Sequence, residues 1–126
     1  MIPKFRVFDK TENKMWDVET IYIEDEWVKA NDGSIYGTTK DLVRDYVLMQ
    51  STGLIDKNGV EIYEGDIVRY NRGVSYSVEK FPYSVKYIEG AFVFEHGFIQ
   101  HNLFKNVKYV TVIGNIYENP ELLEDN

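Results

Sequence analysis

Residues 52–68 read TGLIDKNGVEIYEGDIV, and the order of apolar runs and turn residues in them is the clearest fold signal of the chain. Their β-branched and apolar residues come in short runs, which is typical of β-strands. A tight turn is predicted from Asp56 to Gly59. Gly59 can take a positive φ angle, and an Asp side chain can form hydrogen bonds with the backbone of its own turn. Gly65 and Asp66 then break the chain before a second apolar run, a pattern that recurs in SH3-like barrels. The stretch therefore predicts two short strands separated by sharp turns.

Similar short runs extend outward on both sides of this stretch. Turn signals separate them every 8 to 12 residues or so, a spacing that predicts a small barrel or sandwich. Aromatic residues make up 15% of the chain, which also favours strands. The predicted strands cover residues 5–8, 15–18, 20–23, 47–50, 60–63, 67–70, 75–80, 84–88, 91–95 and 109–113.

One short helix is predicted over residues 38–46. Thr38 is a suitable N-cap, and Asp41 then lies in the first turn, where a carboxylate favours the helix dipole. Leu42 and Tyr46 would share one apolar face. We therefore expect a mostly β protein with this one short helix.

The 126 residues fit one domain, or one domain with a small appendage. The chain contains no cysteine, which rules out disulfides and thiolate metal sites. Residues 1–6 lack the apolar run of a signal peptide, and no apolar run reaches the roughly 20 residues that span a membrane. We therefore expect a cytoplasmic protein without contact to a membrane.

The net charge of −7 is unevenly distributed. Residues 51–117 carry seven basic and seven acidic side chains, so the acidic excess lies in residues 1–50 and in the tail, residues 118–126. Such a balance gives no general attraction to a phosphate backbone. Nucleic acid is therefore an unexpected partner, and the acidic tail is interpreted as a solubilising segment.

Residues 52–68, called the opening stretch below, contain several carboxylates, which is a pattern that an enzyme could use. Asp56, Glu61 and Asp66 offer oxygens that a divalent ion or a hydrolase would use. A calcium loop, however, needs a longer series of alternate ligands than residues 56–61 supply. The favoured interpretation is structural, with Asp56 building a turn and Asp66 a bend before a strand.

Other catalytic patterns are missing from the sequence. His96 and His101 are five residues apart, a spacing that places two side chains on one face of neither a helix nor a strand. The chain has no Gly-x-Ser-x-Gly motif and no glycine-rich phosphate loop. We therefore expect no enzyme activity, no catalytic residue, no metal and no cofactor.

Aromatic side chains are the main candidates for binding. Tyrosine and tryptophan are enriched at subunit interfaces, so we expect a homo-oligomer and a further protein partner. The alternative is a single-stranded nucleic-acid-binding protein, in which aromatic rings and basic side chains of residues 69–87 form the platform. The candidate residues of that stretch are Arg69, Tyr70, Arg72, Tyr76, Tyr83 and Tyr87.

The closing stretch, residues 112–123, reads VIGNIYENPELL. Asn115 and Tyr117 are binding candidates because they lie in a polar and aromatic segment. The structural interpretation is a strand end, with Asn119 capping a short helical turn that begins at Pro120.

These two stretches resemble the YopX family. The shared pattern comprises the Thr-Gly-Leu and Asp-Lys-Asn-Gly block, the Glu-Gly-Asp-Ile-Val block and the closing Val-Ile-Gly-Asn-Ile-Tyr-Glu-Asn-Pro-Glu-Leu-Leu. The start of the chain, KFRVFD at residues 4–9, also fits. Ser51 departs from the pattern, since the family commonly has an aromatic residue there. The resemblance implies a phage or prophage accessory protein that is largely β and self-associating, and it supplies no catalytic residues.

The expected architecture has two parts that form one structural unit. Residues 1–50 are a strand-rich segment containing the short helix. Residues 51–126 are a small SH3-like barrel with an acidic C-terminal tail. The function expected from the sequence is that of a non-catalytic protein-interaction module.

Overall fold

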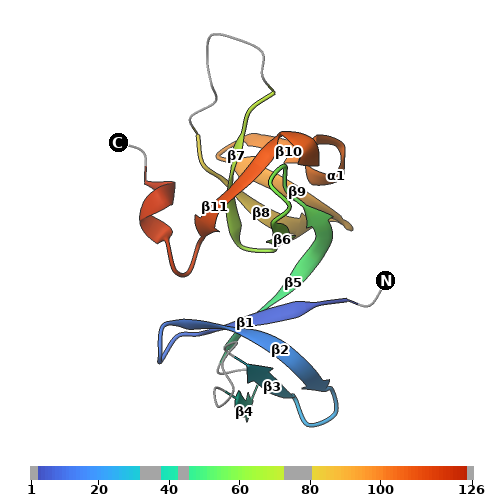
Figure 1. Cartoon of the computed structure of the whole chain (residues 1–126), viewed down its shortest axis with the longest axis vertical. Coiled ribbons are helices and arrows are strands. Elements are labelled where there is room, and N and C mark those ends of the chain that lie inside the picture. Colours follow the sequence, from blue (N-terminus) through green and yellow to red (C-terminus); the bar gives the residue numbers. More distant parts are fainter. Residues whose placement is uncertain (1–2, 32–37, 43–45, 73–80, 125–126) are drawn as a thin grey trace. The chain divides into compact units, whose positions relative to one another are not determined.

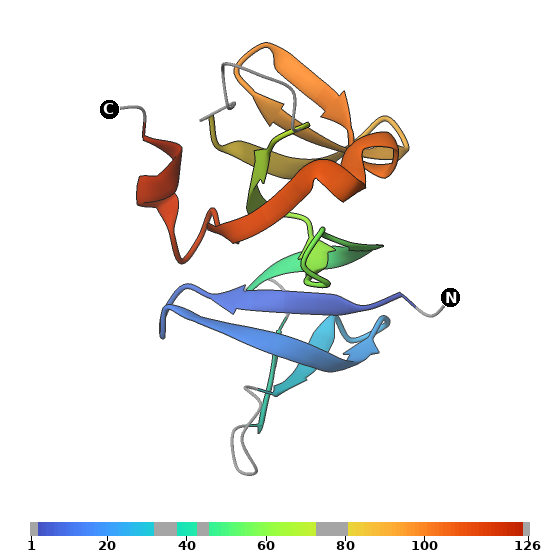
Figure 2. The same cartoon turned by 45° about the horizontal axis from the view of Figure 1, so that its top comes forward.

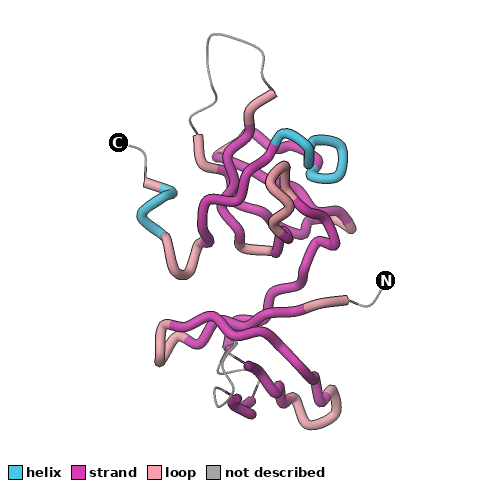
Figure 3. The backbone as a smooth tube through the Cα atoms, in the orientation of Figure 1, coloured by secondary structure: helices cyan, strands magenta, loops and turns pink. Residues whose placement is uncertain are grey.

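The computed structural model describes residues 3–31, 38–42, 46–72 and 81–124 (Figure 1). The chain folds as two compact units, unit 1 (residues 1–50) and unit 2 (residues 51–126). Strands dominate the described backbone of both, as the magenta tube in Figure 3 shows. The predicted mostly β class is confirmed.

The described part of unit 1 is built from antiparallel strands: β1 (Phe5–Asp9), β2 (Lys14–Tyr22), β3 (Trp27–Asn31), β4 (Thr38–Leu42) and the first half of β5 (Tyr46–Ile55). They lie in the order β4-β3-β2-β1-β5. Val7 on β1 is opposite Trp16 on β2, and Val28 and Ala30 on β3 complete the buried cluster. Val28 and Ala30 share a face because side chains of a strand alternate with a period of two.

The helix predicted over residues 38–46 is wrong, because residues 38–42 form strand β4. This strand pairs with β3 from Asn31↔Thr38 to Trp27↔Leu42. A helix of this length is marginal in water, and β-branched threonines weaken it further. Pairing with β3 satisfies the backbone groups of β4 instead. Residues 43–45 lie outside the described residues.

Unit 2 contains the second half of β5, which pairs with β6 (Glu61–Tyr63), and a separate antiparallel sheet. The strands of that sheet are β7 (Asp66–Tyr70), β8 (Tyr83–Ile88), β9 (Ala91–His96), β10 (Ile99–Asn102) and β11 (Val110–Asn115). Their order is β10-β9-β8-β7-β11. The buried cluster of unit 2 comprises Ile62, Val68, Tyr70, Tyr83, Val85, Phe94, Leu103 and Val110.

Three short helical segments of unit 2 are described: α1 (Leu103–Asn106), η2 (Val107–Tyr109) and η3 (Pro120–Leu123). Asn102 caps α1, since its side-chain oxygen accepts a hydrogen bond from Lys105 N at 2.9 Å. Figure 2 follows the chain from β10 through α1 into β11. Within the described ranges, no helix has both the length and the apolar character that a membrane crossing requires.

The five-stranded sheet does not close into the barrel that the sequence predicted, since β10 and β11 remain its two edges. β10 is only four residues long, and α1 and η2 lead the chain away before β11 begins. Residues 56 and 57 occupy the outer side of β11. Lys57 N donates to Val110 O at 3.1 Å, and Val112 N donates to Asp56 Oδ2 at 2.9 Å. Turn residues therefore take the place that a closing strand would need.

Candidate functional site

Asp56, the central acid of the opening stretch, is a structural residue. Its side chain is 3% exposed. Oδ1 accepts hydrogen bonds from Asn58 N at 2.8 Å and Val60 N at 2.9 Å, and Oδ2 accepts the bond from Val112 N. Burial raises the pKa of Asp56, but these three backbone donors outweigh burial and hold the pKa below its ordinary value. The carboxylate thus fixes its own turn and protects the edge of β11.

Asp66 has a similar structural role at the start of β7. It is 2% exposed, and its Oδ2 accepts a hydrogen bond from Tyr63 N at 2.7 Å. This bond holds the bend between β6 and β7 that the Gly65-Asp66 pair predicts. In the ranges that the structure describes, no three His, Asp or Glu side chains gather in a group that could hold a metal ion.

The closing stretch is held by its own amide side chains. Asn115 is 7% exposed, and its Oδ1 accepts hydrogen bonds from Tyr117 N at 3.0 Å and Glu118 N at 2.8 Å. Asn119 Oδ1 accepts a bond from Asn115 N at 3.1 Å. The predicted turn from Pro120 is present as η3, but Asn119 makes no side-chain cap to it. Asn115 and Asn119 thus stabilise the turn after β11, and Tyr117 lies half-buried within that turn.

Gly114 explains why the closing turn fits against β11. A Cβ atom at this position would lie 2.6 Å from Asn119 Oδ1 and 2.9 Å from Leu122 Cδ1. The absence of a side chain therefore lets the Asn119 side chain approach the strand closely.

The aromatic candidates of residues 69–87 are divided between core and surface. Tyr70 and Tyr83 are 5% and 0% exposed, and their rings meet edge to face at 6.2 Å. Tyr70 Oη also donates to Asn106 Oδ1 at 3.0 Å. Both rings belong to the core, so a ligand cannot stack on them in this structure. Tyr76 lies outside the described residues.

The remaining candidates of this stretch are exposed. Tyr87 is 54% exposed and packs edge to face on Phe92, with ring centroids 4.9 Å apart. Arg69 and Arg72 are exposed on and just after β7. Among the described members of the predicted set, two cations and one ring therefore lie on the surface.

An apolar surface that was not predicted from the sequence lies at the β9–β10 hairpin. We define the hairpin patch as Phe81, His96, Phe98 and Ile99. Phe81 stacks on His96 with centroids 4.8 Å apart, and Ile99 is the cross-strand partner of His96. Phe98 is fully exposed at the turn, while Phe81 and Ile99 are 44% and 42% exposed. An apolar Gly97-Phe98-Ile99 in place of polar turn residues was the sequence signal for this patch.

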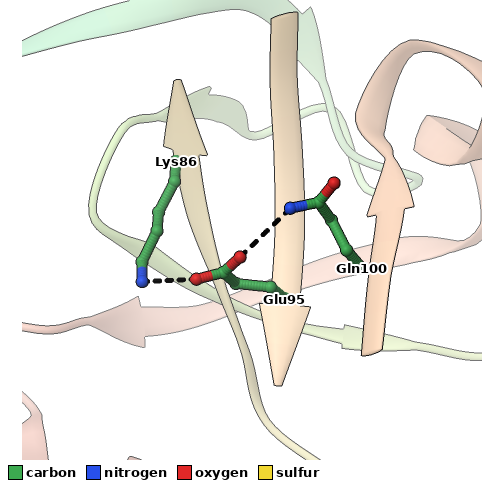
Figure 4. Close-up of polar contacts among 3 residues, drawn as sticks. All are labelled: Lys86, Glu95 and Gln100. Carbon is green, nitrogen blue, oxygen red and sulfur yellow. Dashed lines mark hydrogen bonds and ion pairs between the residues drawn. The ribbon is translucent and has the colours of Figure 1, made fainter. Parts of the chain in front are cut away.

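Polar side chains hold the three strands next to this patch in register (Figure 4). Lys86 on β8 donates to Glu95 Oε1 on β9, and Gln100 Nε2 on β10 donates to Glu95 Oε2 at 3.2 Å. The hydrogen bond from Lys86, supported by the one from Gln100, lowers the pKa of the Glu95 carboxyl. The hairpin that carries the patch is thus tied to its neighbours across the sheet.

A second surface feature joins the end of β7 to η2. Arg72 Cζ and Lys108 Nζ lie 5.5 and 5.2 Å from the centroid of the same ring, that of Tyr109. We define these three residues as the basic–aromatic cluster. Arg72 was a candidate from the sequence, but Lys108 and Tyr109 were missed because they lie 36 and 37 positions further along the chain.

The comparisons with known proteins agree with the motifs. The model of the YopX protein family matches residues 4–124. The crystal structure of protein EF1440 from Enterococcus faecalis is 36% identical, covers 98% of this chain and 99% of its own, and has a TM-score of 0.68. Protein yopX from Bacillus subtilis is 20% identical, with coverages of 98% and 97% and a TM-score of 0.63, so its likeness concerns the fold alone. No curated protein matches the chain. The chain belongs to the YopX family.

Proposed function

We propose that this protein is a phage-derived, non-catalytic accessory protein that acts in the host cytoplasm by binding proteins, including further copies of itself. The observation that carries the proposal is the hairpin patch, where three large apolar side chains lie exposed around one turn. Fully burying a side chain such as Phe98 or Ile99 contributes roughly 1.5–3 kcal/mol to association. Aromatic side chains at such positions are typical anchors of protein interfaces.

Self-association is supported by the charge around the patch. Residues 96–104 contain no Asp, Glu, Lys or Arg, although 28% of the whole chain is charged. Two copies that each carry a net charge of −7 repel one another, so an uncharged segment is where they approach at the least electrostatic cost. The segment includes β10, which lies at an edge of its sheet and can pair with a strand from a second copy.

The non-catalytic part of the proposal is supported by how the acids are used. The carboxylate of Asp56 accepts three backbone hydrogen bonds, and that of Asp66 accepts the bond from Tyr63 N. Side chains committed to backbone donors in this way are poor general acids, bases or metal ligands. The most specific motif of the chain therefore serves the fold, and function is left to the exposed surface.

The molar mass in solution tests self-association. We expect the wild-type protein to sediment above its monomer mass at micromolar concentration. The double variant Phe98→Ser/Ile99→Ser should sediment as a monomer, because both side chains are exposed at the patch and neither belongs to the buried core. Ile23→Ser is the matched control, since Ile23 is 83% exposed in a turn of unit 1 and its change should leave the mass unaltered.

Two results contradict the proposal. A strictly monomeric wild-type protein, together with no co-purifying partner from infected cells, removes the interaction function. An oligomer that survives the double variant unchanged places the interface elsewhere. The phage origin is tested by the flanking genes, which should encode replication, packaging or anti-defence proteins of a phage.

A second candidate function is single-stranded nucleic-acid binding. Arg69 and Arg72, two of the residues proposed from the sequence, are exposed. Neither forms an ion pair with a carboxylate of the described residues. The Tyr70 and Tyr83 rings are buried and cannot serve as the predicted platform, whereas Tyr87 of the same stretch is 54% exposed.

A further inference from the structure

We propose that the basic–aromatic cluster of Arg72, Lys108 and Tyr109 is a binding site for single-stranded nucleic acid. The inference rests on the second candidate function and names the residues that would perform it. It is independent of self-association through the hairpin patch. Arg72 and Lys108 contact phosphates of the backbone, and the exposed part of the Tyr109 ring contacts a base.

The two stretches of sequence that supply this site are basic, although the whole chain is acidic. Residues 67–72 contain Arg69 and Arg72 and no acidic side chain. Residues 96–117 contain Lys105 and Lys108 and again no acidic side chain. Strand pairing brings these two stretches together, because Tyr70 is opposite Val110 and Asn71 N donates to Tyr109 O at 3.0 Å. The fold thus brings Arg72 and Lys108, from distant parts of an acidic chain, to the same ring.

The geometry brings two like charges to one ring. Both the Arg72 guanidinium and the Lys108 ammonium lie within 5.5 Å of the Tyr109 centroid. The ring quadrupole attracts each cation, but it does not neutralise their mutual repulsion. Neither group pairs with a carboxylate of the described residues. Phosphate is an anion that both Arg and Lys side chains bind, so a nucleic-acid backbone is a suitable ligand for this pair of cations.

Tyr109 makes single-stranded nucleic acid a better fit than a simple anion. Its ring is half-buried and is steadied by an edge contact with Tyr70, at a centroid distance of 6.3 Å. In the protein alone the two cations lie over this ring. A base stacks on the ring, regardless of sequence, when the two cations turn to the phosphates of the strand. The stacking surface is a single ring, so the expected affinity is low and salt-dependent.

Fluorescence anisotropy with a labelled oligo-dT strand at low salt tests the site. We expect binding by the wild-type protein that weakens as salt is raised. Arg72→Ala and Lys108→Ala should each weaken it and flatten the slope of log affinity against log salt by about 0.7. Tyr109→Leu should weaken binding by at least about fivefold while leaving the salt slope unchanged. Lys10→Ala, which removes one exposed charge from the β1–β2 turn, is the matched control and should have no effect.

The possible outcomes separate this site from the general function. No binding by the wild-type protein overturns both the site and the nucleic-acid function, and leaves the protein-interaction proposal untouched. Binding that persists in the three cluster variants overturns the site alone. Inorganic polyphosphate or duplex DNA that binds as tightly as oligo-dT shows that Tyr109 stacks on no base, which overturns the assignment of a single strand. Urea unfolding of each variant verifies that it is folded.

Discussion

Replacing Asp56 by alanine is expected to lower the free energy of unfolding of unit 2 by about 2–4 kcal/mol. The substitution removes the acceptor of three backbone N–H groups, those of Asn58, Val60 and Val112. The site is 3% exposed, so water does not readily replace the lost carboxylate. A buried donor left without a partner costs about 1–3 kcal/mol. Urea denaturation followed by tyrosine fluorescence measures the loss.

Asp56→Asn provides a graded control. Its amide oxygen can still accept from Asn58 and Val60, but its NH₂ group cannot accept from Val112. The expected loss is therefore smaller than that of the alanine variant, about 1–2 kcal/mol. Equal stability of the wild-type protein and the alanine variant would mean that the opening stretch does not hold the fold.

The same carboxylate predicts a pH dependence. The pKa of Asp56 is lower in the folded protein than in the unfolded chain, so the unfolded chain takes up a proton first as the pH falls. The stabilisation by Asp56 is therefore complete above the ordinary carboxyl pKa of about 4 and is lost as the pH falls through the folded pKa. The stability difference between the wild-type protein and Asp56→Asn should be constant near neutral pH and shrink below about pH 4.

Phe94→Ala is the second large effect, with an expected loss of about 3–5 kcal/mol. Phe94 is fully buried, and its ring centroid lies 5.2 Å from that of Tyr70, 5.3 Å from Tyr83 and 5.1 Å from His101. Truncation removes the centre of this aromatic group and leaves a cavity that neighbouring strands cannot collapse to fill. The loss appears as a lower urea midpoint with an unchanged m-value.

Phe104→Ala is the matched control, because Phe104 is the same residue type but 74% exposed on α1. Its substitution should change the stability by no more than about 0.5 kcal/mol. If Phe94→Ala does not fold, Phe94→Leu keeps most of the volume and should lose less than the alanine variant. If Phe94→Ala and Phe104→Ala lower the free energy of unfolding by similar amounts, Phe94 does not lie in the core of unit 2.

Local patterns predicted much of the strand content. The runs at residues 5–8, 67–70 and 91–95 correspond to β1, β7 and β9, with ends that shift by one residue at most. These runs carry β-branched and aromatic residues and are bounded by turn signals, so local sequence suffices to find them. The segment at residues 38–46 failed because its helical pattern was short and pairing with β3 prevailed.

Long-range features were beyond local patterns. The edge of β11 is protected by the hydrogen bond from Val112 N to Asp56, which joins residues 56 positions apart. The burial of Tyr70 and Tyr83 was missed because a tyrosine suits a core and an exposed platform equally well. The sequence alone predicted a turn at Asp56 and a binding role for Arg72. It did not predict that Asp56 would contact Val112 or that Arg72 would contact Tyr109.

Hydrogen exchange at the Val112 amide shows whether the opening stretch protects the edge of β11. This amide donates to Asp56 Oδ2 rather than to a neighbouring strand. We expect it to be protected in the wild-type protein. In Asp56→Asn it should lose more protection than the amides of Val85 and Phe94 inside the sheet. Asp56 does not protect the edge of β11 if the Val112 amide exchanges freely in the wild-type protein. The same follows if, in Asp56→Asn, this amide loses no more protection than the amides of Val85 and Phe94.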